Sequence, residues 1–233
     1  LIFDPLSQKE PPMRFLVLAL ALILAAPAAH AASTPGRLEF NVTRNGEPFG
    51  RHTVVVTEAN GELSVRNSVA LRASVGPITV FRFEHDCTER WRAGALQAMQ
   101  CQTLEDGNRT QMNAARNASG IRVTGPAGTT TFGADALPTS WWTASVLNRS
   151  RLIDAETGAD MPVSITRRGS ETLTIAGQSV RTTRYLVRVT LDMDIWYDEA
   201  GRWVRAGFTA RGQRIEYQLV SPLSAAPRRA RNS

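Results

Sequence analysis

A cysteine pair, a histidine and a carboxylate are the residues of this chain whose chemistry is easiest to name. Strand alternation places His85, Cys87 and Glu89 on one face, and a turn centred on Gly94 brings Cys101 back opposite Cys87. A thiol, an imidazole and an acid together could support acid–base or cysteine chemistry. A disulfide would remove that nucleophile, and we expect Glu89 to pair with an arginine near the sheet edge.

The two cysteines, Cys87 and Cys101, are expected to form a disulfide. Their number is even, and the chain carries the export signal described below, which favours oxidation. The bond would close a loop of about 15 residues and contribute ~3 kcal/mol in the chain-entropy model. We expect no metal site, because His52 and His85 lack ligand spacing, and nothing in the sequence predicts a cofactor.

Acidic residues form a second set of candidates. An enzyme of the cell envelope would use carboxylates such as Glu84, Asp86 or Glu89. Alternation puts the first two on the strand face opposite Cys87, which must face water. A further acidic series that resembles a loose calcium cluster comprises Asp192, Asp194, Asp198 and Glu199. Strand alternation predicts that the first three form a solvated face rather than a metal site.

Aromatic side chains are the remaining candidates for a binding function. The chain contains five tryptophans. Most of them are expected in the core or at turns, and the rest are expected to line an apolar cavity. The candidate ligand-lining residues are Trp141, Trp142, Trp91, Phe83 and Tyr185.

The elements that must position these residues are short strands joined by turns. Asn45-Gly46 follows an alternating strand and is a strong hairpin signal, because both residues accept a positive φ. Similar turn residues recur along the chain, which indicates an antiparallel meander. We predict an all-β fold in which the meander forms a curled sheet, half-barrel or barrel with one short helix at 138–149.

The longest alternation lies between residues 181 and 197. Its apolar positions are Tyr185, Val187, Val189, Leu191, Met193, Ile195 and Tyr197. A single strand of this length must twist and coil, which favours a curled sheet or barrel unless a bulge near Asp192 divides it. We expect 138–149 to lie across the concave side, with a mostly apolar pocket beneath it.

The N-terminal residues predict export. A basic start, an apolar run and the small-x-small sequence Ala29-His30-Ala31 are typical of a secretory signal peptide. We expect cleavage after Ala31 and a soluble periplasmic or secreted product. The predicted organisation is a spurious upstream segment at 1–12, a signal peptide at 13–31, a single β domain at 32–222 and a basic disordered tail at 223–233.

The charge is positive but dispersed. The formal net charge is +6. Nucleic-acid binding is disfavoured, because an exported protein rarely meets nucleic acid and the basic residues are scattered. The C-terminal arginines are Arg228, Arg229 and Arg231. They predict either a solvated end or a weak contact with an anionic surface.

Several of these motifs together resemble a known family. They are the Asn45-Gly46 hairpin, Phe49-Gly50, and the strand motifs at 194–198, 201–204 and 214–217. They resemble an uncharacterised proteobacterial family of exported all-β proteins, a domain of unknown function, over about residues 37–220. That family has no catalytic residues to transfer. A more distant, fold-level resemblance is to lipoprotein carriers of the LolA/LolB type, in which a curled sheet holds acyl chains under a helical lid.

Three functions remain open from the sequence. The first is a noncatalytic periplasmic binding or carrier module for an apolar or amphiphilic, lipid-like ligand, which requires a cavity lined by tryptophans. The second is a structural or protein-interaction module of the envelope, which requires an exposed apolar patch or an open sheet edge. The third is an envelope enzyme, which requires two or more acids that converge in a cleft.

Overall fold

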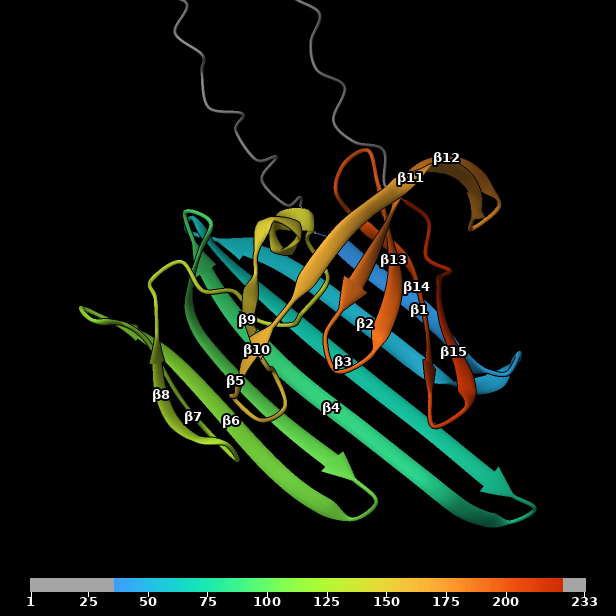
Figure 1. Ribbon diagram of the computed structural model, residues 1–233, viewed down its shortest axis with the longest axis horizontal. Helices are drawn as coiled ribbons and strands as arrows, with labels where there is room; N and C mark the ends of the chain where they lie inside the picture. Colours follow the sequence, from blue (N-terminus) through green and yellow to red (C-terminus); the bar gives the residue numbers. More distant parts are fainter. Residues whose placement is uncertain (1–35, 224–233) are drawn as a thin grey trace, which may run out of the picture.

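The computed structural model describes residues 36–223, and nearly every segment of it is a β-strand (Figure 1). The predicted signal peptide, the segment before it and the three C-terminal arginines lie outside the described residues. The strands are β1 (Gly36–Arg44), β2 (Glu47–Ala59), β3 (Glu62–Val75), β4 (Ile78–Arg92), β5 (Ala95–Glu105), β6 (Asn108–Asn117), β7 (Gly120–Gly125), β8 (Gly128–Phe132), β9 (Arg151–Ile153), β10 (Asp160–Pro162), β11 (Ser164–Ile175), β12 (Gln178–Arg188), β13 (Asp192–Asp198), β14 (Trp203–Ala210) and β15 (Gln213–Leu219).

Thirteen strands form one antiparallel sheet in the order β11-β12-β13-β14-β15-β1-β2-β3-β4-β5-β6-β7-β8. β1 pairs with both β2 and β15, so the first and last strands of the described residues lie side by side within the sheet. β8 and β11 stand at the two ends of this order. The sheet of the described residues is therefore open and not a closed barrel, and the predicted antiparallel meander is confirmed.

One face of the sheet, here called the inner face, carries the core. β3 and β4 show the reason most clearly, because their residues alternate between buried and exposed positions. Val65 is fully buried, whereas the neighbouring Arg66 is exposed. The largest core cluster includes Phe40 of β1 stacked on Trp203 of β14, with 4.1 Å between ring centroids. Burial of one face thus specifies the register of β3 and β4.

Residues 133–163, here called the cover segment, lie over the inner face (Figure 1). They contain the β9–β10 hairpin and a 3-10 helix, η1 (Ala144–Asn148). Val146 and Ile153 of this segment belong to the same core cluster as the sheet residues. No helix among residues 36–223 is long and apolar enough to cross a membrane.

The predicted short helix is confirmed, although it is shorter than 138–149. Thr143 is extended and caps η1, because its side-chain oxygen accepts a hydrogen bond from the backbone N–H of Ser145. Pro138 is also extended and forms a bridge to Ile153. Proline and β-branched threonine favour these extended conformations, so only one short helical stretch remains.

The predicted single strand over 181–197 is wrong. The chain turns at residues 189–191, and β12 pairs with β13 as an antiparallel hairpin. The backbone N–H of Val189 donates to the carbonyl of Leu191 within this turn. Tyr185 lies opposite Ile195 and Val187 opposite Met193, so both halves still place their apolar residues on the inner face. The turn preserves the alternation, which is why the sequence pattern hides it.

Candidate functional site

The predicted disulfide is present between β4 and β5. Cys87 and Cys101 are directly opposite in register, their Cα atoms are 4.0 Å apart, and their sulfur atoms are bonded. The His85 side chain lies beside them, with a ring nitrogen within 4.8 Å of the sulfurs. Because thiolates are the form of cysteine that binds metals, the bonded sulfurs are not available as thiolate ligands. In this state the cysteines fasten two neighbouring strands.

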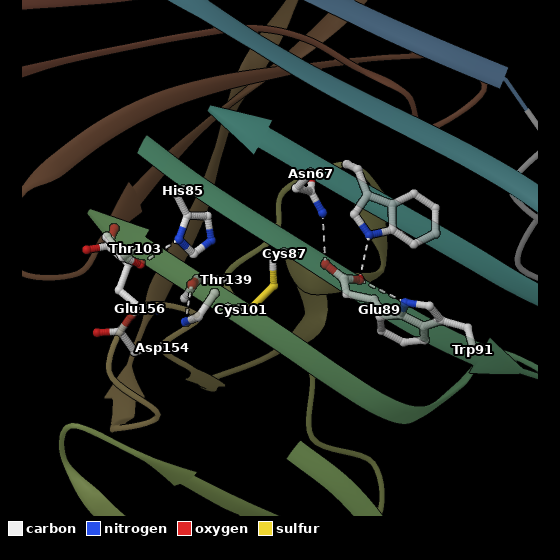
Figure 2. Close-up of a disulfide and its surroundings, with 12 residues drawn as sticks. Asn67, His85, Cys87, Glu89, Trp91, Cys101, Thr103, Thr139, Asp154 and Glu156 are labelled. Carbon is white, nitrogen blue, oxygen red and sulfur yellow. Dashed lines mark hydrogen bonds between the residues drawn. A yellow bond between two sulfur atoms is a disulfide. The ribbon is translucent and has the colours of Figure 1, made fainter. Parts of the chain in front are cut away.

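Glu89 is completely buried on the inner face, and Figure 2 shows what holds it. One carboxylate oxygen accepts from the Asn67 amide at 3.0 Å. The other accepts from the indole N–H groups of Trp91 at 2.8 Å and Trp142 at 3.1 Å. The predicted pairing of Glu89 with an arginine is wrong, because the arginines of β4, such as Arg90, lie on the opposite face of the strand.

The environment of Glu89 favours the protonated acid. Burial raises the pKa of Glu89 to about 7, while hydrogen bonds from Ser140, Trp142 and Trp91 act in the opposite direction by favouring the carboxylate. Trp142 and Ser140 belong to the cover segment, whereas Glu89 and Trp91 belong to β4. Glu89 therefore ties the cover segment to the sheet, and its chemistry is that of an anchor.

A row of side chains crosses the inner face next to the disulfide. His52 of β2, Val69 of β3 and His85 of β4 lie opposite one another in successive strand pairs. The row continues to Thr103 of β5, whose hydroxyl lies 2.8 Å from Nδ1 of His85. We call His52, His85 and Thr103 the polar row. It brings the two histidines into one part of the sheet, although they are far apart in the sequence.

Two acids of the cover segment lie beside this row. Figure 2 shows Asp154 and Glu156 near Thr103 and His85. Burial lowers the pKa of His85, and the negative charges of Asp86 and Asp154 partly offset that effect. Burial also raises the pKa of Glu156 to about 7, and the like charges of Asp154 and Glu105 add to the shift. An imidazole and two acids thus lie near one another here, with His85 buried, Asp154 partly buried and Glu156 exposed at the solvent side.

His52 is the least satisfied polar group of the row. Burial lowers its pKa to about 4, so the ring is neutral at neutral pH. The ring packs against Trp203 and Tyr217, with centroid separations of 5.2 Å and 5.9 Å. Its Nε2 atom is buried and has no well-formed hydrogen bond among residues 36–223, although an interaction with the Asn67 side chain partly offsets the lowering of the pKa. A buried polar atom without a partner requires an explanation, and an absent ligand is one of them.

A second apolar cluster lies on the other side of the polar row from Glu89. We call it the mouth cluster; it comprises Val42, Phe49, Val69, Leu71, Ala73 and Ile215, with the partly buried Phe81, Phe83, Phe208 and Tyr217 packed against it. Phe83 stacks on His85 with 6.4 Å between ring centroids, and Tyr217 contacts His52. Apolar side chains that reach solvent therefore adjoin the two histidines directly.

The structure separates the five predicted ligand-lining residues. Trp91 and Trp142 are buried edge-to-face against each other beside Glu89. Trp141 is partly buried, and its carbonyl accepts a hydrogen bond from Tyr197. The remaining two are the partly buried Tyr185 of β12, which packs on the main core, and Phe83 of the mouth cluster. Only Phe83 adjoins the polar row.

The predicted carboxylates do not converge. Glu84 is paired with Arg82, and Asp86 accepts from Ser68, both on the outer face and away from Glu89. The acidic series of β13 has separate arginine partners, which are Arg188 for Asp192, Arg184 for Asp194 and Arg202 for Asp198. Asp192 is exposed, as the predicted solvated face requires, whereas Asp194 is partly buried. Asp198 is buried, because its carboxylate also accepts backbone N–H bonds from the following turn.

Sequence reasoning missed most of the polar row and its neighbours. His52 was recognised only as an isolated histidine, and its inward parity on β2 is the signal that could have found it. Asn67 shares the inward parity of Val65, which is unusual for an amide and could also have been noticed. Asp154 and Glu156 lie in a turn, and nothing local predicts their contact with strands more than 50 residues away.

Comparison with known proteins gives a family and a fold. The crystal structure of a β-barrel-like protein of domain of unknown function DUF1849, from Brucella abortus, is similar to this chain with a TM-score of 0.60 and 10% identity, over 80% of this chain and 95% of that one. At this identity the likeness shows the fold alone. No curated protein matches the chain.

The predicted resemblance to LolA/LolB-type carriers is not shown by these matches and stays a prediction. The family model described as a domain of unknown function, DUF6134, matches residues 40–220. This range runs from within β1 to just past the end of β15, and so includes the polar row, the mouth cluster and the cover segment. The chain therefore belongs to the DUF6134 family.

Proposed function

We propose that this protein is an exported, noncatalytic binding or carrier module for an amphiphilic, lipid-like ligand. One observation carries the proposal, namely that Nε2 of His52, which is buried and has no well-formed hydrogen bond among residues 36–223, lies beside the solvent-reaching mouth cluster. An amphiphile offers a polar head and an apolar chain. The polar row would take the head, and the mouth cluster would take the chain.

The chemistry of the polar row suits a head group with hydroxyl or carboxyl character. A neutral imidazole can donate or accept a hydrogen bond at Nε2, depending on its tautomer. His52 is neutral because its pKa is lowered to about 4. Pairing this atom with a ligand would remove the cost of leaving it buried without a partner. A ligand at this place would therefore gain affinity from a group that the free protein leaves unsatisfied.

The ligand is placed beside Phe83 and not beneath Trp142. The space under the cover segment is occupied by Trp91, Trp142 and Glu89, which hydrogen-bond to one another. Phe83 and Phe81 are only partly buried, so an acyl chain can reach them from solvent. Binding there would bury apolar area at about 25 cal/mol per Å².

The test is the binding of a fluorescent fatty acid to purified protein. The wild type is expected to bind with micromolar affinity, and Phe83→Ala is expected to weaken binding by about tenfold, which corresponds to about 1.4 kcal/mol. Phe132→Ala is the matched control, because Phe132 is also a partly buried phenylalanine but packs on the main core at β8. Equal affinities for all three proteins, or no binding by the wild type, would reject the proposal.

Export is the second part of the proposal. The bonded cysteines support it, because disulfides persist in oxidising compartments. The predicted signal peptide at 13–31 supports it independently. Mass-spectrometric sequencing of the protein from its native host should find a mature N-terminus at Ala32. A product that retains Met13 on a membrane would contradict it.

A protein-interaction module of the envelope is the second candidate function. It is favoured by the tip of the β3–β4 hairpin, where Val75, Ile78 and Val80 are 68%, 65% and 54% exposed. Exposed apolar groups that adjoin one another mark interaction surfaces. A photo-crosslinker placed at Ile78 in cells should then give one discrete protein adduct, and the same crosslinker at the exposed Thr129 of edge strand β8 should give none. Identical patterns at both positions would remove this candidate.

A further inference from the structure

The outer face of the sheet carries a hollow that is independent of the inner-face site. It has a volume of about 590 Å³ and lies across strands β11 to β15. Its charged lining residues are Arg168, Arg184, Arg188, Arg214, Asp192 and Asp194. Four arginines and two aspartates leave an excess of two positive charges along the walls. We call this hollow the arginine groove.

A β-bulge directs one of these arginines. Arg167 lies opposite Tyr185 and Gly169 opposite Arg184, so Arg168 is the extra residue of β11 and has no partner in β12. Bulges of this kind change the direction in which a side chain points. Arg168 is exposed, and no hydrogen bond or ion pair is recorded for it among the described residues. Its five N–H donors are therefore available to a ligand.

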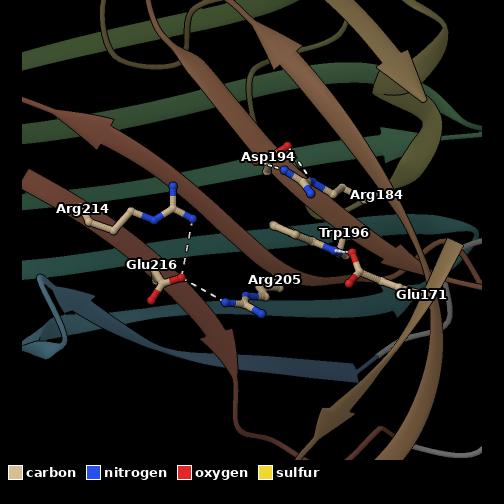
Figure 3. Close-up of polar contacts among 7 residues, drawn as sticks. All are labelled: Glu171, Arg184, Asp194, Trp196, Arg205, Arg214 and Glu216. Atoms are coloured by element: carbon tan, nitrogen blue, oxygen red, sulfur yellow. Dashed lines mark hydrogen bonds and ion pairs between the residues drawn. The ribbon is translucent and has the colours of Figure 1, made fainter. Parts of the chain in front are cut away.

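A glycine forms the floor of the groove. Gly207 of β14 lies between Asp194 of β13 and Glu216 of β15. A Cβ atom added at this position would lie 2.5 Å from Nη2 of Arg214, so the guanidinium rests where a side chain would otherwise stand. Arg214 is 3.6 Å from Glu216, which lies closer to Arg205, at 3.0 Å (Figure 3). Arg214 thus keeps donors for another acceptor.

The remaining wall is held in place. Arg184 donates from Nε and Nη2 to the two oxygens of Asp194, at 2.9 Å and 2.6 Å. Trp196 is buried between Arg184 and Arg205, whose guanidinium carbons lie 5.3 Å and 5.2 Å from its ring. The indole N–H of Trp196 donates to Glu171 at 2.6 Å (Figure 3). Fixed cations cost less conformational entropy to engage than flexible ones.

We propose that the arginine groove binds a phosphate-bearing anion. A phosphoryl group has three acceptor oxygens and up to two negative charges, which matches forked donors that arrive from several strands and an excess of two positive charges. A single carboxylate would satisfy fewer of these donors. The volume exceeds that of one phosphate and lies within the range of small-molecule sites, so the ligand is a phosphate ester or a phosphorylated head group.

The test uses purified full-length protein and two kinds of probe. Inorganic pyrophosphate is titrated by calorimetry at low salt, and vesicles of phosphatidylcholine and phosphatidic acid in equal parts are tested by co-sedimentation. Arg168→Gln with Arg214→Gln should weaken the binding of the probe that the wild type binds by at least about tenfold. Both side chains are exposed, so folding should be retained, and the thermal unfolding temperature checks this.

Two control variants distinguish a specific anion site from general electrostatic attraction to a basic protein. Arg90→Gln with Arg122→Gln removes the same charge from exposed positions of β4 and β7, and should change affinity less than about twofold. Gly207→Ala keeps the charge but displaces Arg214 from the floor, and should also weaken binding. Binding of pyrophosphate identifies a soluble phosphate ester, and binding of vesicles alone identifies a lipid head group. No binding of either probe, or equal losses in both double variants, would overturn the proposal.

Discussion

Buried polar residues of the inner face differ in how many hydrogen bonds they form. Glu89 accepts hydrogen bonds from three N–H donors, whereas Nε2 of His52 has no well-formed hydrogen bond within residues 36–223. A fully satisfied buried group rigidifies the structure, and an unsatisfied one is available for binding. This contrast is the reason that we assign anchoring to Glu89 and ligand recognition to the row that contains His52.

Glu89 should make stability depend on pH. The ordinary pKa is 4.5 and burial raises it to about 7, so the folded protein binds this proton more tightly than the unfolded chain. The stabilisation is complete below pH 4.5 and is lost as the pH rises through 7. The unfolding free energy of the wild type, relative to Glu89→Gln, should therefore fall by on the order of 3 kcal/mol across this window.

Urea unfolding at a series of pH values measures this difference. The raised pKa of Glu156 also makes the unfolding free energy fall as the pH rises. The pKa of His52 is lowered to about 4, so His52 makes the unfolding free energy rise with pH over an overlapping range. Both proteins contain these groups, so their contributions cancel in the comparison. A difference between the two proteins that does not change with pH would contradict the assigned environment of Glu89.

At the scale of elements, two contacts hold neighbouring parts of the fold together. The disulfide joins β4 to β5, and the indole of Trp142 joins the cover segment to Glu89 of β4. The inner-face site lies between the elements that these contacts hold. Removal of either contact should lower the unfolding free energy and leave the side chains of the polar row in place.

Trp142→Phe tests the fastening of the cover segment. The change keeps an aromatic ring in the core but removes the N–H donor to Glu89, and should cost about 1–3 kcal/mol of unfolding free energy, as expected when a buried acceptor loses its donor. Trp141→Phe is the control, because Trp141 contributes only its backbone carbonyl to a recorded hydrogen bond. Equal losses for the two variants in urea unfolding would show that ring volume, and not the N–H group, matters.

Replacement of both cysteines by alanine tests the other fastening. The unfolding free energy should fall by ~3 kcal/mol in the chain-entropy model. Reduction of the wild type with a dithiol should reproduce the same loss, and thiol labelling of the native, non-reduced protein should find no free thiol. Two reactive thiols under oxidising conditions would contradict the structure and reopen metal and nucleophile chemistry for this pair.

The elements also show what the sequence could and could not reveal. The alternation of apolar and polar residues predicted β4 and its disulfide. Both depend only on which face of the strand each residue occupies and on the turn that follows. The same rule concealed the turn at 189–191, because an antiparallel return places residues of equal parity on the same face. The partners of Glu89 come from β3, β4 and the cover segment, and no local pattern brings Trp142 to a residue 53 positions earlier.

The whole molecule is an open, curved sheet with a different chemistry on each face. The inner face buries the core and carries the polar row and the mouth cluster. The outer face carries ion pairs and, over β11 to β15, the arginine groove. An open sheet leaves the inner face accessible from one side, as a filled and closed barrel would not. This architecture is consistent with the binding function that we propose.

Native mass spectrometry of the protein purified from its own host tests the central claim most directly. The account predicts that the wild type retains a lipid-like molecule as a discrete mass adduct. Phe83→Ala should lose the adduct, and Phe132→Ala should keep it, because only the first residue belongs to the mouth cluster. A wild-type spectrum that contains only the bare polypeptide, together with no uptake of added fatty acid, would contradict the account.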